Sequence, residues 1–180
     1  MRLIILLFLS IHLYADIKQN MFDLYQNSKY EDVCSIGFDN FNRYRKDEEF
    51  ISLYAFSCLN SDYIDRLAIP IAILKSSKEA RANSAYFSVI LMQKKLLYHA
   101  LVDNNDLSKL DLPTTDYVLS RVFELYTHIG VHEPRAFYLF DDPLNSKLKY
   151  KLYLVKEAGL SKMVIEEFYD TITIKRHVYW

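Results

Sequence analysis

The chain has 180 residues, of which 51% are hydrophobic and 25% charged, as is ordinary for a folded globular protein. A net charge of −1 excludes the basic footprint of a nucleic-acid-binding protein and gives no polybasic membrane anchor. With only 3 Gly and 4 Pro, the composition argues for packed helices and against a Gly-rich phosphate loop.

The first stretch, residues 1–15, is typical of a secretory signal peptide. Arg2 supplies a positive start, and the apolar run after it is shorter than the ~20 residues that span a membrane. Ala15 is an acceptable cleavage position before Asp16. We therefore expect an exported protein, periplasmic or otherwise, with no membrane span after cleavage. An uncleaved anchor and a buried core helix are the alternatives.

Helical spacing of apolar residues runs from residue 16 to residue 130. It predicts short helices over residues 19–27, 30–45, 48–59, 63–74 and 117–126. Pro70 should kink its helix or mark a restart. The longest stretch, Lys78–Asp103, has no Gly or Pro, and its apolar run predicts a central helix that is covered on most sides.

The period changes after residue 130. A short aromatic run, 136–140, is followed by alternating runs over 149–156, 163–169 and 172–179, joined by short turns. This pattern predicts an antiparallel meander with one face packed on helices, and Ile172, Ile174 and Val178 are expected on a shared apolar face. Residues 161–169 fit a helix as well as a strand.

Together these patterns predict an α+β protein. Residues 16–130 form a helical repeat-like domain, with antiparallel helix pairs around the long central helix. Residues 131–180 form a small C-terminal antiparallel β-meander.

A faint internal repeat lies in the helical part. Residues 28–32 and 61–65 share the pattern S-x-Y-x-D, each at a turn between two short helices. Over residues 19–76 the chain resembles tetratricopeptide repeats, in which an aromatic opens the second helix of a repeat of about 34 residues. Tyr30 and Val33 match the aromatic and small positions, while Arg66 and Pro70 depart from the pattern. The resemblance implies a surface that binds peptides or protein partners.

Cys34 and Cys58 are predicted to form a disulfide. Each lies twelve residues from Lys46, in the turn between two helices that should run antiparallel, so both sit at the same height. Gly37 would let the two backbones approach, and export would place the thiols in an oxidising compartment. Two separate buried thiols are the alternative. Neither cysteine has a C-x-x-C partner or a catalytic surround.

Other candidate residues give no catalytic, cofactor or metal site. His128 and His132 have the spacing of metal ligands on a helix, but Gly130 lies between them and no third ligand is nearby. Five pairs of adjacent charges are interpreted as solvated surface: Glu48-Glu49, Asp141-Asp142, Glu166-Glu167, Lys94-Lys95 and Lys175-Arg176.

The absence of a nucleophile, metal or phosphate signature favours an exported soluble protein that binds a protein or peptide without catalysis and without a cofactor or nucleic acid. One alternative is an exported hydrolase-type enzyme with a site at the junction of helices and sheet. Another is a structural subunit of an envelope complex.

Overall fold

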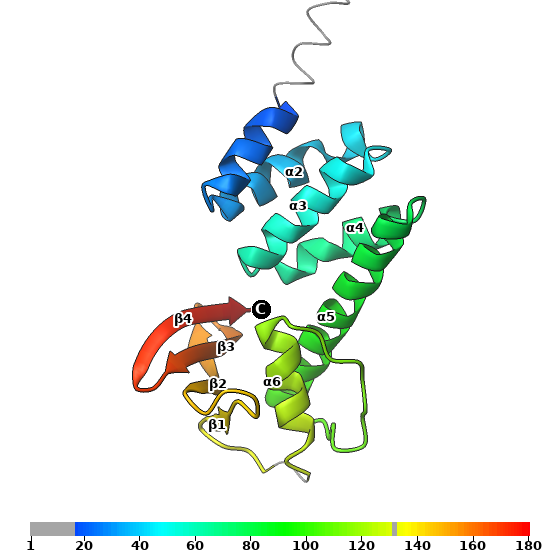
Figure 1. Cartoon of the computed structure of the whole chain (residues 1–180). Helices are drawn as coiled ribbons and strands as arrows, with labels where there is room; N and C mark the ends of the chain where they lie inside the picture. The colour runs from blue at the N-terminus through cyan, green and yellow to red at the C-terminus, as the bar shows by residue number, and fades with distance from the viewer. Residues whose placement is uncertain (1–16, 131–132) are drawn as a thin grey trace, which may run out of the picture. The chain divides into compact units, whose positions relative to one another are not determined.

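The computed structural model describes residues 17–130 and 133–180, and it confirms the α+β fold with a C-terminal antiparallel meander (Figure 1). The signal-peptide prediction falls on residues outside the described ones. The elements in chain order are a helix over residues 17–26, α2 (Tyr30–Tyr44), α3 (Glu48–Asn60), the 3-10 helix η1 (Ile64–Leu67), α4 (Ala68–Ile73), α5 (Lys78–Asp103), α6 (Val118–Thr127), β1 (Tyr138–Asp141), β2 (Leu148–Glu157), β3 (Leu160–Tyr169) and β4 (Ile172–Tyr179).

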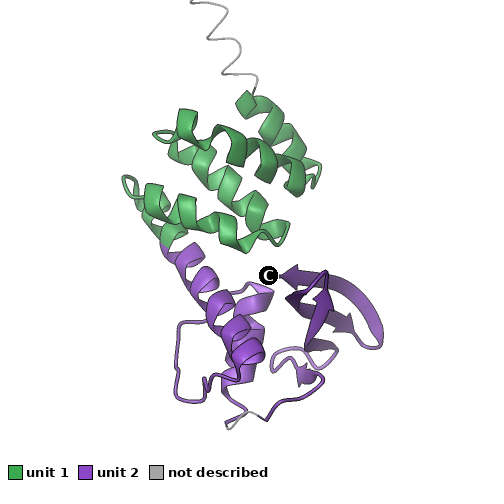
Figure 2. Cartoon of the chain, turned by 180° about the vertical axis from the view of Figure 1, so that it is seen from behind, with its two compact units in different colours: residues 1–84 green, residues 85–180 purple. Residues whose placement is uncertain are grey.

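The chain divides into two compact units, residues 1–84 and 85–180 (Figure 2). The boundary falls inside α5, the long helix that the Gly- and Pro-free stretch predicts. The second unit therefore contains residues 85–103 of α5 and the whole of α6 together with the sheet. The change from helix to strand comes later, between α6 and β1. Among the described helices, none combines the length and the apolar character that crossing a membrane requires.

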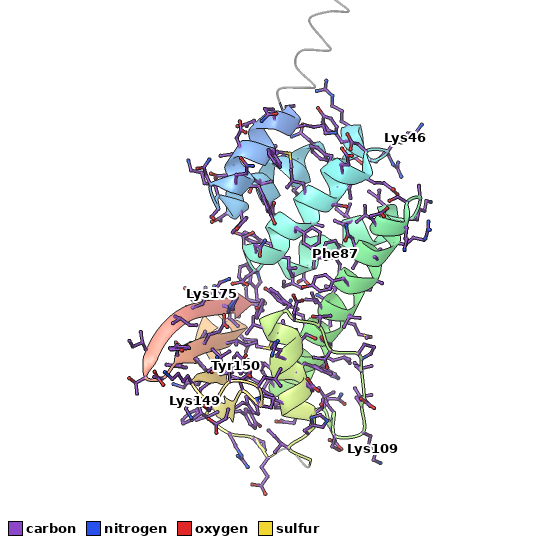
Figure 3. The ribbon with its side chains drawn as sticks, viewed as in Figure 1. Lys46, Phe87, Lys109, Lys149, Tyr150 and Lys175 are labelled. Atoms are coloured by element: carbon purple, nitrogen blue, oxygen red, sulfur yellow. A yellow bond between two sulfur atoms is a disulfide. The ribbon has the colours of Figure 1, made fainter. Side chains whose placement is uncertain are left out.

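In the first unit, α2 and α3 form an antiparallel pair around the turn that contains Lys46 (Figures 1 and 3). Asp47 caps α3, because its side chain accepts a hydrogen bond from the amide of Phe50 at 3.1 Å. Gly37 allows the close approach of the helices, since a Cβ there would lie 2.5 Å from the ring of Tyr54. Tyr54 is fully buried, which raises the pKa of its hydroxyl to about 12.

The two turns before α2 and η1 repeat one another. Lys29 (φ −83°, ψ 56°) and Tyr63 (φ −80°, ψ 56°) have the same backbone conformation, and each follows a left-handed residue. The amide of Lys29 donates to the carbonyl of Leu24, as that of Tyr63 donates to that of Cys58. The equivalent of Ser28 is thus Asp62, and the alignment of the two S-x-Y-x-D patterns is wrong by one position. The left-handed residue sets the geometry of each turn, and both Ser28 and Asp62 accept that conformation.

The second helix of the second pair is broken as Pro70 predicts. The chain runs from η1 into α4, and Pro70 lies in the first turn of α4, where its missing amide loses no helical hydrogen bond. Arg66 in η1 has a structural use as well. Its guanidinium lies over the rings of Phe38 (4.6 Å) and Tyr63 (4.7 Å) and donates to the sulfur of Cys34 at 3.3 Å.

Glu48, at the start of α3, fixes the loop before α5. Its carboxylate accepts hydrogen bonds from the amides of Lys75, Ser76 and Ser77 at 3.1, 2.7 and 2.9 Å. These amides, those of Ser76 and Ser77 foremost, lower the pKa of Glu48 from 4.5 to about 2. The depressed pKa means that the ionised form stabilises the folded state.

We expect Glu48→Gln to lower the thermal midpoint of helix unfolding at pH 7, because a neutral amide accepts these hydrogen bonds less strongly. The stability from Glu48 is fully present above pH 4.5 and is lost as the pH falls through 2, so the difference from wild type should shrink over that window. Circular dichroism melts between pH 2 and pH 7 measure it. Glu49→Gln is the matched control, because Glu49 is 90% exposed; an equal effect of both changes would contradict the loop-fixing role of Glu48.

In the second unit, the sheet has the strand order β1-β2-β3-β4 with every pair antiparallel. Residues 160–169 are strand β3, which settles the alternative between helix and strand. Leu152 pairs with Ile165 and Leu154 with Met163 on the inner face, as the alternation predicts. The most buried inward side chains are Tyr138, Tyr150, Leu152, Met163, Ile165, His177 and Tyr179.

The expectation for β4 is wrong. Ile172 and Ile174 are 69% and 55% exposed, and the inward side chains of β4 are His177 and Tyr179. His177 and Tyr179 lie opposite Ile165 and Met163, so Val178 projects to the other face, opposite Val164. A register shift between Glu167 and Phe168 then breaks the alternation and places Ile172 opposite Tyr169, so Ile172 and Val178 do not share a face.

The buried carboxylate of Asp142 ties β1 to β2 and α6. It accepts from the hydroxyl of Tyr150 at 2.7 Å and from the amides of Leu144 and Asn145, and Arg121 of α6 lies 3.4 Å away. Burial disfavours the charge, but these donors outweigh it, so the pKa of Asp142 lies below its usual value. Tyr150, labelled in Figure 3, is 1% exposed.

Candidate functional site

The second unit contains a pocket of about 330 Å³ at the place where β2 extends beyond β1. This volume is at the lower end of the range for small-ligand sites. The end of α5, the loop after it, α6, the segment before β1, and β2 each supply lining residues. Those that matter for its chemistry are Ala100, Leu101, Tyr126, Arg135, Tyr138 and Leu154.

β2 has an open edge beside this pocket. β1 pairs only with the stretch from Lys149 to Leu152, whereas β2 continues to Glu157. The carbonyl of Leu148 accepts from the amide of Asp142, on the β1 side, and alternate residues of a strand direct their main-chain groups to the same edge. The amide and carbonyl groups of Leu154 and Lys156 therefore face this open edge. Within the described parts of the chain, no strand pairs with them there.

The floor of the pocket is apolar and packed. Ala100, Tyr126 and Tyr138 are 2%, 1% and 6% exposed, and the two tyrosine rings meet edge to face at 5.1 Å. The hydroxyl of Tyr138 donates to the carbonyl of Glu133 at 2.7 Å. Burial, with Tyr138 next to it, raises the pKa of Tyr126 far above its usual value. The hydroxyl of Tyr126 in the floor is thus uncharged at physiological pH.

Among its described residues, the rim carries one cation, Arg135, and one carboxylate, Asp106, and no ion pair joins the two. The carboxylate oxygens of Asp106 accept from the amide and the hydroxyl of Ser108 at 2.9 and 3.0 Å, which orients this carboxylate towards its own loop and leaves its charge in place. Arg135 is exposed, and its guanidinium lies 5.7 Å from the centre of the Tyr138 ring. No carboxylate of residues 17–130 or 133–180 forms an ion pair with it, so Arg135 can bind an anion from outside.

A second hollow, of about 420 Å³, lies in the first unit between the helix over residues 17–26 and α3. Phe22 (49% exposed), Phe50 and Leu53 make it apolar. On its rim the ammonium of Lys18 already binds Asp47 at 2.8 Å and Glu49 at 3.5 Å. The ammonium at this hollow is therefore already paired with carboxylates, and the walls are helices whose main-chain groups are used.

Cys34 and Cys58, the two cysteines expected to pair, form a disulfide between α2 and α3, with Cα atoms 4.7 Å apart. Both are fully buried, so Cys34 offers no thiolate to a substrate. His128 is exposed at the C-cap of α6, and His132 lies outside the described residues. In the described part of the chain, no three His, Cys, Asp or Glu side chains are placed to hold a metal ion.

The interpretation of the adjacent charges as solvated surface is wrong for two of them. Asp142 is 5% exposed, for the reasons given above. Lys94 is 2% exposed, because its stem is covered while its ammonium donates to the main-chain oxygen of Trp180 and lies 5.6 Å from the ring of Tyr98. The interpretation is confirmed for Lys95, Lys175 and Arg176, which are exposed.

His177 and Glu167 form the His–carboxylate pair that a hydrolase would need, with 2.9 Å between Nε2 and Oε1. However, the His177 side chain is 1% exposed and stacks on Tyr179. A substrate cannot reach this ring in the present conformation, so the pair contributes to the core of the second unit.

The sequence reasoning missed Arg135 and Leu154. The signal was present in the run lengths, because the aromatic run before β2 has five residues and the alternating run of β2 has eight. A short strand next to a long one leaves part of the long strand without a partner. No local sequence pattern predicts that residues of α5 and α6 line the pocket at that edge.

Comparisons of the chain with protein-family models, with curated proteins and with solved structures found no match.

Proposed function

We propose that the protein is an exported, non-catalytic polypeptide-binding module whose site lies in the second unit. The observation that supports it most is the open edge of β2 at Leu154 and Lys156, directly beside an apolar pocket. An extended segment that pairs with such an edge gains main-chain hydrogen bonds that do not depend on sequence. The pocket next to the edge then selects the side chain that the segment presents.

The first unit supports the same class of function. The turn before α2 recurs before η1, and the tetratricopeptide repeats that the sequence resembles recur in the same way, about every 34 residues. Helix pairs of that kind serve as binding scaffolds. Phe22 adds an exposed aromatic side chain at the apolar hollow of this unit.

Export is supported by two features of the chain. Residues 1–15 have the pattern of a signal peptide, with Ala15 as the cleavage position. The Cys34–Cys58 bond belongs in an oxidising compartment such as the periplasm.

We expect Lys156→Pro to abolish peptide binding and Lys156→Ala to retain it. Proline removes the amide at the open edge, and it removes no β2–β3 hydrogen bond, because the amide of Lys156 faces away from β3. The side chain of Lys156 is exposed, so its truncation to Ala should not disturb the fold. The measurement is fluorescence polarisation of a fluorescein-labelled pool of random hexapeptides, half with free and half with amidated C-termini.

Circular dichroism controls for the fold of both variants. Equal binding by the Lys156→Pro and Lys156→Ala proteins would remove the edge from the proposal. If neither wild type nor any variant binds the pool, the protein is not a polypeptide-binding module.

A further inference from the structure

Two features bear on which part of a polypeptide this site would bind. They are the direction of a strand paired with β2 and the guanidinium of Arg135. We propose that this site binds the free C-terminal end of a polypeptide, with an apolar last side chain in the pocket and the terminal carboxylate on Arg135. This inference rests on the proposed function, since it specifies the ligand of the same site.

The first step concerns strand direction. A segment that pairs antiparallel with β2 runs in the same direction as β1, because β1 is itself antiparallel to β2. Such a segment would lie in line with β1, before its N-terminal end, and opposite Leu154 and Lys156 of β2. Its C-terminal end would then point at the beginning of β1, at Tyr138.

The second step is that β1 blocks any continuation. The position opposite Leu152 is already taken by Tyr138, so an antiparallel ligand cannot extend past Leu154 along the edge. The chain before β1 bends at Ala136 and borders the pocket, which closes the site at that end. A ligand that ends there fits, whereas one that continues must leave the sheet.

The third step is electrostatic. Arg135 lies on the pocket at this closed end, three residues before Tyr138 in the chain, and it has no ion-pair partner among the described residues. A carboxylate at the end of the ligand would pair with its guanidinium through charge-assisted hydrogen bonds. A ligand in the opposite, parallel direction would instead bring an ammonium group towards Arg135, and like charges disfavour that orientation.

The fourth step concerns the side chain. Paired residues on neighbouring strands project to the same face of a sheet, so the ligand residue opposite Leu154 points where Leu154 points. On that side lie Ala100, Leu101 and the tyrosine rings of the floor. Because this floor is buried and is formed by apolar and aromatic side chains, it favours an aliphatic or aromatic side chain at the end of the ligand.

The test is a double-mutant cycle between the protein and the end of the peptide. The probes are fluorescein-labelled hexapeptides whose last three residues vary among Ala, Val, Leu and Phe, made once with a free carboxylate and once as the amide. The proteins are the full chain with the wild-type sequence, Arg135→Gln and Lys109→Gln. Lys109 is an exposed basic residue outside the pocket lining (Figure 3), so its variant has the same net charge as Arg135→Gln.

We expect the free acid to bind wild type and Lys109→Gln at least about tenfold more tightly than the amide, and Arg135→Gln to lose that preference while keeping the affinity of the amide. If acid and amide bind wild type equally, or if Arg135→Gln weakens both to the same extent, the carboxylate is not recognised, although polypeptide binding stands. Preference for an internal Asp or Glu over a free C-terminus would also overturn the inference. If no peptide binds at all, the proposed function fails with it.

Discussion

Leu152→Asp is expected to destabilise the second unit by more than about 3 kcal/mol, because it buries a carboxylate without a partner. Leu152 is fully buried in the second strand of a four-stranded sheet, opposite Ile165 on one neighbour and Tyr138 on the other. No basic side chain lies opposite it on either strand. The cost is comparable to much of the stability of a small domain, so the variant should populate unfolded forms of this unit in dilute denaturant.

The single tryptophan of the chain, Trp180, reports on this unit, since its ring lies 5.0 Å from the ammonium of Lys162 on β3. Urea unfolding followed by its fluorescence measures the loss. Leu139→Asp is the matched control: it makes the same chemical change on the outer face, where Leu139 is 58% exposed opposite Lys151, and we expect it to cost less than about 0.5 kcal/mol. Equal losses in the two variants would mean that the inner face is not the core of the sheet.

The elements of this protein could be predicted from local sequence because their signals are local. The long helix Lys78–Asp103 lacks Gly and Pro over its whole length, and α5 has the predicted bounds. The cap at Asp47 and the restart at Pro70 depend on one residue and its neighbours along the chain. The alternating run of β2 likewise fixes which of its side chains face the core.

The parts that could not be predicted depend on contacts between distant residues. His177 and Tyr179, rather than Ile172 and Ile174, face the core because they pair with Ile165 and Met163 of β3, and the alternation in β4 does not encode that pairing. Lys94 and Asp142 resemble solvated charges in sequence, but each is covered by groups far along the chain, such as Trp180 and Arg121. Arg135 and Leu154 line one pocket because β1 begins only opposite Leu152 and leaves the rest of β2 without a partner among the described strands on that side. The pocket is therefore a product of topology rather than of a local motif.

The disulfide between Cys34 and Cys58 is expected to contribute about 3.5 kcal/mol to the stability of the first unit, from the entropy of closing a loop of this length in the unfolded chain. Oxidised wild type should therefore unfold at higher urea than the same protein with dithiothreitol, when the helices are followed by circular dichroism. The Cys34→Ala/Cys58→Ala double variant should unfold like the reduced protein and should not respond to dithiothreitol. Stability of wild type that is unchanged by dithiothreitol would show that the bond does not constrain the unfolded chain.

The same bond gives a test of export that uses the protein from its natural host. If the chain is exported and oxidised, protein that is unfolded and alkylated without reductant should carry no alkyl group. Its intact mass should correspond to a chain that begins at or near Asp16 and has lost two hydrogens at Cys34 and Cys58. Reduction before alkylation should add two alkyl groups, which shows that both thiols are reachable once the chain is unfolded. A mass that includes Met1, with two alkyl groups and no reductant, would contradict both export and the disulfide, because a reducing cytoplasm keeps such thiols free.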